Sequence, residues 1–343
     1  MTPARVGLRV ALFVALCAGL FWDVGGDKMW RASEERCLKV VQEMVRSGDW
    51  LVPRLDGEPR LQKPPLFYWA GAVSATLGGG ANLTTLRCVS GLAALALALA
   101  VWLAGRAWGG DRGADLCVLA LAACALFWVR GRVGDAEMLL ALLVFASLAV
   151  AERLWHSRDA PLLAAVSVLL GLAFLAKATA ALLCFFAPVV AWLALERQLG
   201  LLVRPLVLAW LAVALAIGLS WYAEILWRVP GAGELFRSYL VAPAGVQAGT
   251  NATHLRGLLY YATRFPVQLL PAAVLLPWLA WDGWRRRFWR EQPGVRFWAV
   301  ACLANVVGWT LVPSKQIHYL LPAVPMYAMW AGRALDARWI ARG

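Results

Sequence analysis

The sequence predicts an all-α polytopic membrane protein with about ten transmembrane helices. Hydrophobic residues make up 62% of the 343 residues and charged residues only 15%, against ~45–50% and ~25% in ordinary soluble chains. So little polar surface cannot cover so much apolar bulk in water. Apolar runs of nearly membrane-spanning length recur along the whole chain. These observations exclude a disordered chain and argue strongly against a soluble enzyme.

Ten apolar segments approach the ~20 residues that a spanning helix needs. The first is interpreted as an uncleaved anchor, because no small-residue cleavage site follows it and Phe21 and Trp22 come directly after. The ten segments lie at residues 6–22, 85–105, 114–130, 136–152, 161–176, 179–195, 205–224, 265–282, 297–313 and 317–334.

The net charge of +13 indicates membrane edges rather than nucleic acid. In so apolar a chain, arginines between spans mark the cytoplasmic side and contact anionic lipid, so no nucleic-acid partner is expected. Both termini are therefore predicted to be cytoplasmic, with the protein in the cell (inner or plasma) membrane. The arginines that support this orientation are Arg5, Arg9, Arg106, Arg112, Arg153, Arg158, Arg197, Arg204, Arg285, Arg286, Arg287, Arg290, Arg333 and Arg338.

Two long loops lie on the predicted outer face, at residues 23–84 and 225–264. Between Asp23 and Lys63 the first loop carries eight basic and eight acidic residues. Such charge density is typical of a folded, functional surface rather than a tether. We treat residues 1–343 as a single transmembrane domain that carries these two loops.

Two short helices are predicted within the first outer loop. Residues 34–46 form an amphipathic helix that lies at the membrane interface, with Ser33 as its N-cap and Glu34 on its apolar stripe. After Pro64 and Pro65, residues 66–77 form a second apolar helix that is too short to span. The apolar stripe of the first helix comprises Cys37, Leu38, Val41, Met44 and Val45.

The seven cysteines show no CxxC or metal-ligand spacing, and six of them lie in apolar runs. There a cysteine behaves as a small hydrophobe. Cys37 has no second cysteine in its loop, so no disulfide is expected there. We expect no metal and no cofactor.

An ordered set of motifs carries a family resemblance. The first outer loop contains Ser33-Glu34-Glu35-Arg36, Glu43-Met44, Gly48-Asp49-Trp50-Leu51-Val52-Pro53 and Lys63-Pro64-Pro65. Further along come Gly134-Asp135, Gly171-Leu172-Ala173-Phe174-Leu175-Ala176-Lys177, Trp221-Tyr222, Tyr260-Tyr261, Leu276-Pro277-Trp278, Ser314-Lys315 and His318-Tyr319-Leu320-Leu321-Pro322. In this order they resemble the GT-C glycosyltransferases of the protein O-mannosyltransferase-like group, to which the lipid A aminoarabinose transferase belongs.

The resemblance implies an inverting, integral membrane glycosyltransferase of the GT-C type. Such enzymes take a sugar from a polyprenyl phosphate at the outer face of the membrane, and the acceptor is a lipid, a glycan or a protein. Two alternatives stay open. A polyprenyl-linked sugar transporter would bind the same donor, although the charges cluster at one face and no internal repeat is present. An inactive structural relative is the other, because Ser33 stands where the family has Asp.

The resemblance also assigns roles to residues of the outer face. Glu34 is the expected general base, with Asp135 in support; helix-dipole and N-cap roles are the structural alternatives. Lys63 and Arg36 match positions that contact the donor phosphate; snorkelling and a solvated charge are the alternatives. The residues expected to bind substrate are Lys315, His318, Tyr319 and Tyr260. Gln62 and residues 243–247 depart from the aminoarabinose transferase pattern, which removes its metal site and supports the expectation of no metal.

Overall fold

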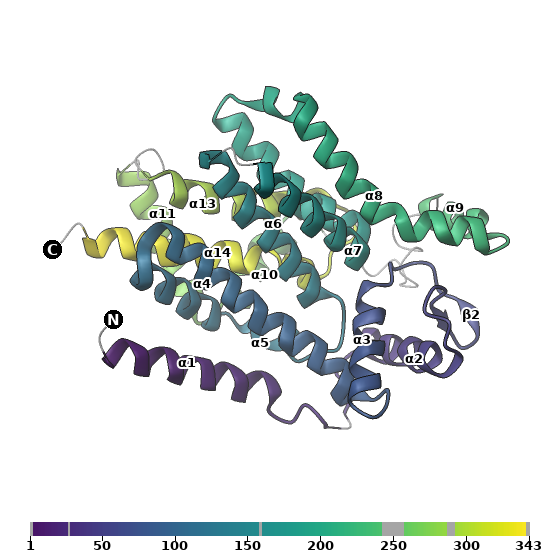
Figure 1. Cartoon of the computed structure of the whole chain (residues 1–343). Helices are drawn as coiled ribbons and strands as arrows, with labels where there is room; N and C mark the ends of the chain where they lie inside the picture. The colour runs from purple at the N-terminus through teal and green to yellow at the C-terminus, as the bar shows by residue number, and fades with distance from the viewer. Residues whose placement is uncertain (1–2, 27, 158–159, 242–256, 287–291, 341–343) are drawn as a thin grey trace.

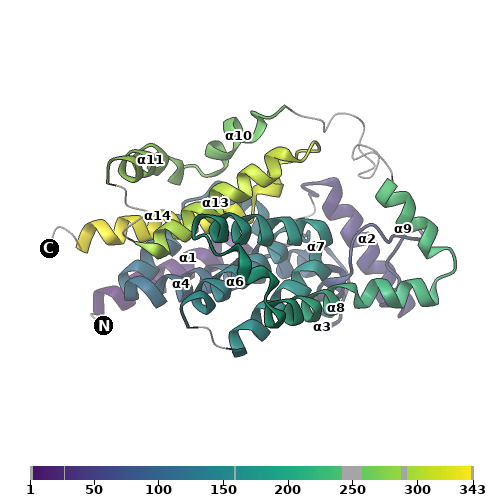
Figure 2. The same cartoon turned by 90° about the horizontal axis from the view of Figure 1, so that it is seen from above.

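The computed structural model describes residues 3–26, 28–157, 160–241, 257–286 and 292–340. Its long helices lie side by side, with both termini at one end of the bundle and α2, α3 and α9 at the other (Figures 1 and 2). We call these the terminal end and the loop end. The elements are α1 Pro3–Phe21, α2 Ala32–Ser47, β1 Arg54–Leu55, β2 Glu58–Pro59, α3 Leu66–Leu77, α4 Leu83–Ala122, α5 Ala125–Gly131, α6 Glu137–Ser157, α7 Ala160–Leu195, η1 Leu199–Val203, α8 Pro205–Arg228, α9 Ala232–Val241, α10 Tyr260–Gln268, η3 Ala272–Val274, α11 Leu275–Arg286, α13 Pro293–Leu311, η4 Ile317–Leu320 and α14 Ala323–Ile340.

Four helices in the described part of the chain are long and apolar enough to cross a membrane: α4, α7, α8 and α13. The first two are each folded back on themselves. In α4 the backbone leaves helical geometry at Gly110, and Trp102 before the turn donates its indole N–H to Asp115 after it. A straight helix would separate these residues by ~20 Å. In α7 the break falls at Lys177 and Ala178. The predicted pairs of segments on either side of these turns are therefore present.

The predicted all-α membrane fold is confirmed, and so are the two helices of the first outer loop. The helix expected at 34–46 is α2, and that expected at 66–77 is α3. Two details were wrong. Ser33 is not the N-cap, because the helix already begins at Ala32 and Arg31 holds that position without a side-chain bond. The Ser33 hydroxyl donates to Asp135. Val45 is exposed, on the edge of the stripe.

Three of the expected spans are interrupted. Residues 114–130 divide between the second arm of α4 and α5 at a turn around Cys124. Residues 265–282 divide among α10, η3 and α11, because Pro266 and Pro271 remove amide donors from the helix. There the backbone carbonyl of Leu270 accepts from the Ala125 N–H instead. The last span begins with η4, and α14 starts only after Pro322.

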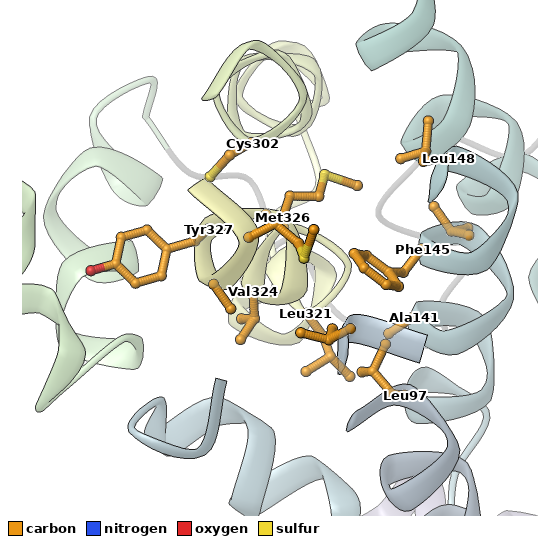
Figure 3. Close-up of a cluster of buried hydrophobic side chains, with 14 of the residues drawn as sticks. Leu97, Ala141, Phe145, Leu148, Cys302, Leu321, Val324, Met326 and Tyr327 are labelled. Carbon is orange, nitrogen blue, oxygen red and sulfur yellow. The ribbon is translucent and has the colours of Figure 1, made fainter. Parts of the chain in front are cut away.

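Helix α14 lies at the centre of the apolar core. Figure 3 shows Leu321, Val324 and Met326 packed towards Phe145 of α6 and Leu97 of α4. This packing fixes the start of α14, and hence η4, against the start of α6. A second cluster joins α2 to α3 and to the first turn of α4; it comprises Cys37, Leu38, Val40, Val41, Met44, Phe67, Tyr68, Ala72, Ala75, Leu86 and Ala136. The two clusters therefore hold the first outer loop against the loop end of the bundle.

Candidate active site

Asp135 lies in the turn between α5 and α6 and is almost fully buried. Its Oδ2 accepts hydrogen bonds from Arg130 Nη1 (3.1 Å) and from Ser33 Oγ (3.3 Å), and its Oδ1 accepts from the Glu137 amide (3.1 Å). Burial raises the pKa of Asp135 and exceeds the opposing effect of the Arg130 charge. The residue therefore caps α6, as the structural alternative proposed, and also presents a carboxylate poised to take up a proton.

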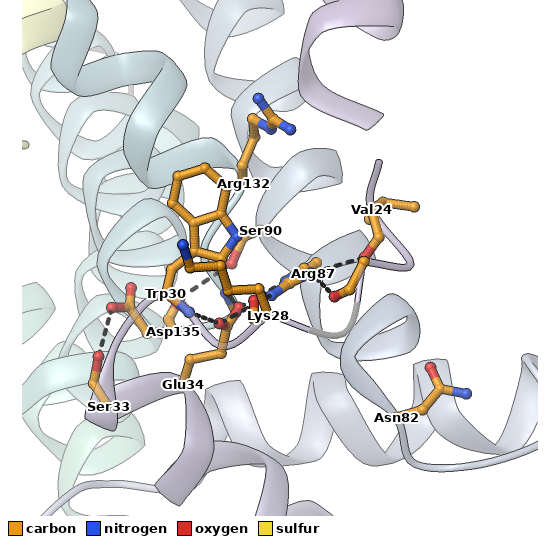
Figure 4. Close-up of polar contacts among 12 residues, drawn as sticks. Val24, Lys28, Trp30, Ser33, Glu34, Asn82, Arg87, Ser90, Arg132 and Asp135 are labelled. Atoms are coloured by element: carbon orange, nitrogen blue, oxygen red, sulfur yellow. Dashed lines mark hydrogen bonds and ion pairs between the residues drawn. The ribbon is translucent and has the colours of Figure 1, made fainter. Parts of the chain in front are cut away.

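Glu34 is also buried, but every face of its carboxylate is occupied. Oε1 accepts from Arg87 Nε (2.9 Å) and from the Gly134 amide (2.9 Å), while Oε2 accepts from the Trp30 amide (3.0 Å) and from Arg87 Nη2 (3.2 Å). Burial opposes its ionisation, and these hydrogen bonds outweigh burial and lower the pKa of Glu34. Figure 4 shows the carboxylate enclosed between Arg87 and Trp30. Glu34 is therefore bonded entirely within the protein, and we call Glu34 and Arg87, with the backbone groups that they bond, the clamp.

Arg87 completes the clamp from the first arm of α4. Besides its two bonds to Glu34, its guanidinium donates to the backbone carbonyls of Val24, Gly26 and Lys28. The clamp thus ties the chain before α2 to the Gly134 turn, beside Asp135. The prediction that Glu34 and Asp135 come together is met through this turn. Sequence reasoning missed Arg87 because a single arginine near the start of an apolar segment resembles an interfacial charge.

Glu137 is a second acidic residue that the sequence reasoning missed. It starts α6 and is nearly inaccessible, with Oε1 bonded to Lys177 Nζ (2.5 Å) and 3.4 Å from His318 Nε2. The Lys177 ammonium also lies 4.6 Å from the centre of the Tyr319 ring. The signal was available in the spacing Gly134-Asp135-Ala136-Glu137, where two carboxylates begin one helix. His318 and Tyr319 thus lie close to Glu137 and Lys177, and their roles in binding substrate stay predictions.

Several cations surround these carboxylates without counterions of their own. The Nε atoms of Arg36 and Arg60 are buried and make no hydrogen bond with the described residues. Within that same part of the chain, no hydrogen bond or ion pair holds the Lys63 ammonium, whose charge acts on Asp135 and Glu137. Pro64 and Pro65 are buried and fix the Lys63 backbone. An excess of unpaired positive charge is typical of an anion site.

The other two expected substrate contacts lie elsewhere in the described structure. Lys315 is buried and donates to the Val312 carbonyl (2.7 Å). Tyr260 starts α10 and packs edge-on against Tyr261, whose hydroxyl donates to the Gln316 carbonyl. No contact in the described ranges brings Lys315 or Tyr260 to Asp135, so their substrate roles stay predictions. Residues 243–247, on which the expected loss of a metal site rests, lie outside the described residues.

The arrangement can bind an anion and accept a proton at one place. The buried carboxylates Asp135 and Glu137 lie within electrostatic range of Lys63, from the loop at residues 23–84. The described residues contain no group of three or more His, Cys, Asp or Glu side chains that could hold a metal ion. A charged loop packed over such a cluster at one end of an apolar helix bundle is the arrangement expected of an integral membrane protein of the GT-C type.

Comparisons with known proteins agree with this class. Residues 62–222 match the family model described as dolichyl-phosphate-mannose-protein mannosyltransferase. The undecaprenyl phosphate-α-4-amino-4-deoxy-L-arabinose arabinosyl transferase of Serratia proteamaculans is 28% identical over 336 residues, which is 96% of this chain and 59% of the relative. These similarities agree with the resemblance that the motifs indicate, to the GT-C glycosyltransferases of the protein O-mannosyltransferase-like and aminoarabinose transferase-like group.

Solved structures show the same fold. The crystal structure of ArnT from Cupriavidus metallidurans bound to undecaprenyl phosphate superposes with a TM-score of 0.82 at 24% identity, covering 96% of this chain and 60% of that one. The oligosaccharyltransferase of Archaeoglobus fulgidus superposes with a TM-score of 0.59 at 14% identity, covering 98% of this chain and 50% of that one. The chain thus spans about three fifths of the length of its aminoarabinose transferase relatives.

Proposed function

We propose that the chain is an inverting glycosyltransferase that moves a sugar from a polyprenyl phosphate to a lipid, glycan or protein acceptor. The observation that carries the proposal is the Lys63 ammonium, which no described residue bonds and whose charge acts on the buried carboxylate of Asp135. The same loop supplies Arg36 and Arg60, whose Nε atoms are buried and unbonded. A phosphate leaving group needs cations around its developing charge, and an acceptor hydroxyl needs a base. The site offers both.

In the proposed reaction Asp135 is the general base. The acceptor oxygen bonds to the anomeric carbon as its proton passes to Asp135, and the bond from that carbon to the phosphate oxygen breaks. The electron pair leaves with the polyprenyl phosphate, where Lys63 and the arginines receive the charge. We assign the base to Asp135 rather than Glu34 because all the lone pairs of Glu34 are already bonded within the protein.

The names of the relatives support the donor class. The Serratia transferase is named for undecaprenyl phosphate-α-4-amino-4-deoxy-L-arabinose, and the Cupriavidus structure holds undecaprenyl phosphate. For this chain the proposal is a polyprenyl-phosphate sugar, with modification of lipid A as one form of the acceptor reaction.

We also propose that the loop end faces outward from the inner membrane. Arg112, at the turn of α4, pairs with Asp336 of α14 near the C-terminus, so this turn lies towards the terminal end. Arg106 and Arg112 belong to the short loops that the positive-inside rule places in the cytoplasm. Residues 23–84 are then the outer catalytic loop, and 225–264 is the second outer loop.

The test uses the chain in lipid nanodiscs with radiolabelled undecaprenyl-phosphate sugar and a lipid A acceptor. Wild type should bind undecaprenyl phosphate, and Lys63→Ala should weaken that binding. Lys39→Ala is the matched control, because Lys39 is a more exposed lysine of α2 that pairs with Asp56. Equal binding by wild type and Lys63→Ala would contradict the proposed phosphate contact. Binding without transfer to lipid A would refute lipid A as the acceptor; binding without transfer to lipid A, glycan or protein acceptors would favour the inactive or transporting alternatives.

A further inference from the structure

Glu137 has one carboxylate oxygen that its surroundings hold and one that they leave open. Oε1 accepts a hydrogen bond from Lys177 Nζ, and His318 Nε2 lies 3.4 Å from it. Oε2 is buried and has no hydrogen-bond partner among the described residues. Because Lys177 of α7 bonds Oε1 and His318 of η4 packs beside it, the direction of Oε2 is set by the fold.

Two other buried carboxylates of the bundle bond through both of their oxygens. Glu34 bonds through both oxygens to Arg87 and backbone amides. Glu152 bonds through both oxygens to Arg333, and also to the indole of Trp298. Buried carboxylate oxygens ordinarily have partners because desolvation without one is costly. The open oxygen of Glu137 therefore indicates a partner that comes from outside the chain.

The chemistry of that partner follows from its neighbours. A carboxylate oxygen accepts hydrogen bonds and repels a phosphate, so the partner presents an O–H or N–H group. Glu137 follows Asp135 by two residues, and the Asp135 carboxylate bonds to the Glu137 amide. A sugar whose anomeric carbon is beside Asp135 therefore has its ring substituents within reach of Glu137.

We propose that Glu137 is a specificity-determining residue: its Oε2 accepts a hydrogen bond from a hydroxyl or amino group of the transferred sugar. Lys177 and His318 act as positioning residues that hold Oε1. The inference rests on the proposed function, because it assumes a donor with a sugar on a lipid phosphate. It divides the site into a phosphate part, formed by Lys63, Arg36 and Arg60, and a sugar part, formed by Glu137.

The test compares two lipids: undecaprenyl phosphate without sugar, and undecaprenyl phosphate-4-amino-4-deoxy-arabinose. Wild type should bind the sugar-bearing lipid more tightly than the bare one. Glu137→Ala should bind the bare lipid as wild type does but lose roughly ten- to a hundredfold in affinity for the sugar-bearing lipid. Lys63→Ala should weaken the binding of both lipids. Glu35→Ala, at an exposed position of α2, should change neither.

Two results would overturn the sugar part of the site alone: equal losses for both lipids in Glu137→Ala, or no loss for either. Binding of neither lipid by wild type would instead overturn the proposed function. A measurement on wild type covers the case in which Glu137→Ala does not fold. Removing each ring hydroxyl or the amino group of the sugar in turn should reveal one position whose loss lowers affinity roughly tenfold or more. Equal affinity for all the analogues would refute the proposal.

Discussion

The two ends of the helix bundle differ in whether their charged side chains have partners within the protein. Towards the terminal end, Glu152 shares both oxygens with Arg333 and Trp298, and Asp336 bonds to Arg112 at 2.6 Å. At the loop end, no hydrogen bond or ion pair in the described structure holds the Lys63 ammonium. Unbonded arginine Nε atoms occur at both ends and do not distinguish them: Arg36 and Arg60 at the loop end, and Arg296, Arg333 and Arg338 towards the terminal end. Charged side chains that hold helices together form hydrogen bonds and ion pairs with one another, whereas charged side chains that bind a ligand lack such partners in the free protein. The loop end is therefore where the chemistry belongs.

The same contrast exists within the loop end, between Glu34 and Asp135. Both carboxylates are buried, yet the pKa of Glu34 is lowered by its bonds to Arg87 and backbone amides, while burial raises that of Asp135. A carboxylate with a lowered pKa stays ionised and holds structure, whereas a raised pKa brings a base closer to the working pH. The predictions below separate these two roles.

The largest effect on the rate of sugar transfer is expected from Asp135→Asn. The amide keeps the size of the side chain and can still cap α6, but it cannot take the acceptor proton. Transfer should fall by ~10²–10⁴-fold, the usual contribution of a general base, while binding of undecaprenyl phosphate persists. Initial transfer rates with radiolabelled donor measure this. The control is Asp56→Asn, at an exposed carboxylate, and transfer by Asp135→Asn at the wild-type rate would refute the assignment.

Glu34→Gln should act on stability more than on chemistry. Breaking a buried ion pair by removing one partner costs ~3–5 kcal/mol, because Arg87 keeps its charge. Thermal unfolding in detergent should show a large loss for Glu34→Gln and almost none for its neighbour Glu35→Gln. If Glu34→Gln instead abolished transfer with unfolding unchanged, Glu34 would be the base after all.

The stability difference between wild type and Glu34→Gln should also depend on pH. The folded-state pKa of Glu34 is lowered, so its contribution is complete above the ~4.3 of an unfolded glutamate and is lost as pH falls through the folded-state value. The difference should therefore be constant near neutral pH and shrink in acid. Unfolding temperatures measured from pH 7 down to pH 4 and below test the sign; a difference that grows in acid would contradict it.

The sequence predicted the elements of the loop end better than the contacts between them. The apolar stripe from Cys37 to Met44 defined α2, and Pro64 and Pro65 defined the start of α3, since both signals are local. Arg87 and Glu137 were missed because a charged residue at the end of an apolar run looks like an interfacial charge. Their partners are 53 and 40 residues distant in sequence, and only the tertiary fold shows that they meet.

A smaller effect, on donor affinity, should distinguish the unpaired Lys63 from the paired Arg112. Lys63→Ala should lower affinity for undecaprenyl phosphate roughly ten- to a hundredfold, because a charge-assisted hydrogen bond to phosphate contributes ~1.5–3 kcal/mol. Arg112→Ala, at the other end, should leave donor affinity unchanged while lowering stability, since Arg112 bonds to Asp336. Titration of donor binding in nanodiscs measures both. Equal losses of donor affinity in the two variants would remove the distinction between the ends.

The smallest effect on transfer is expected from Ser33→Ala. Ser33 stands where the family has Asp. Its hydroxyl donates to Asp135 Oδ2 at 3.3 Å, a bond that favours the ionised carboxylate. Ser33→Ala removes a bond typically worth ~0.5–1.5 kcal/mol, so the pKa of Asp135 should rise further. The acid limb of the pH–rate profile should then move to higher pH, with transfer a few-fold slower below neutral and nearly normal above it. Ser47→Ala, at an exposed serine at the end of α2, controls for general effects. A slower rate at every pH with no shift of the limb would mean that Ser33 positions Asp135 or the substrate rather than tuning a base.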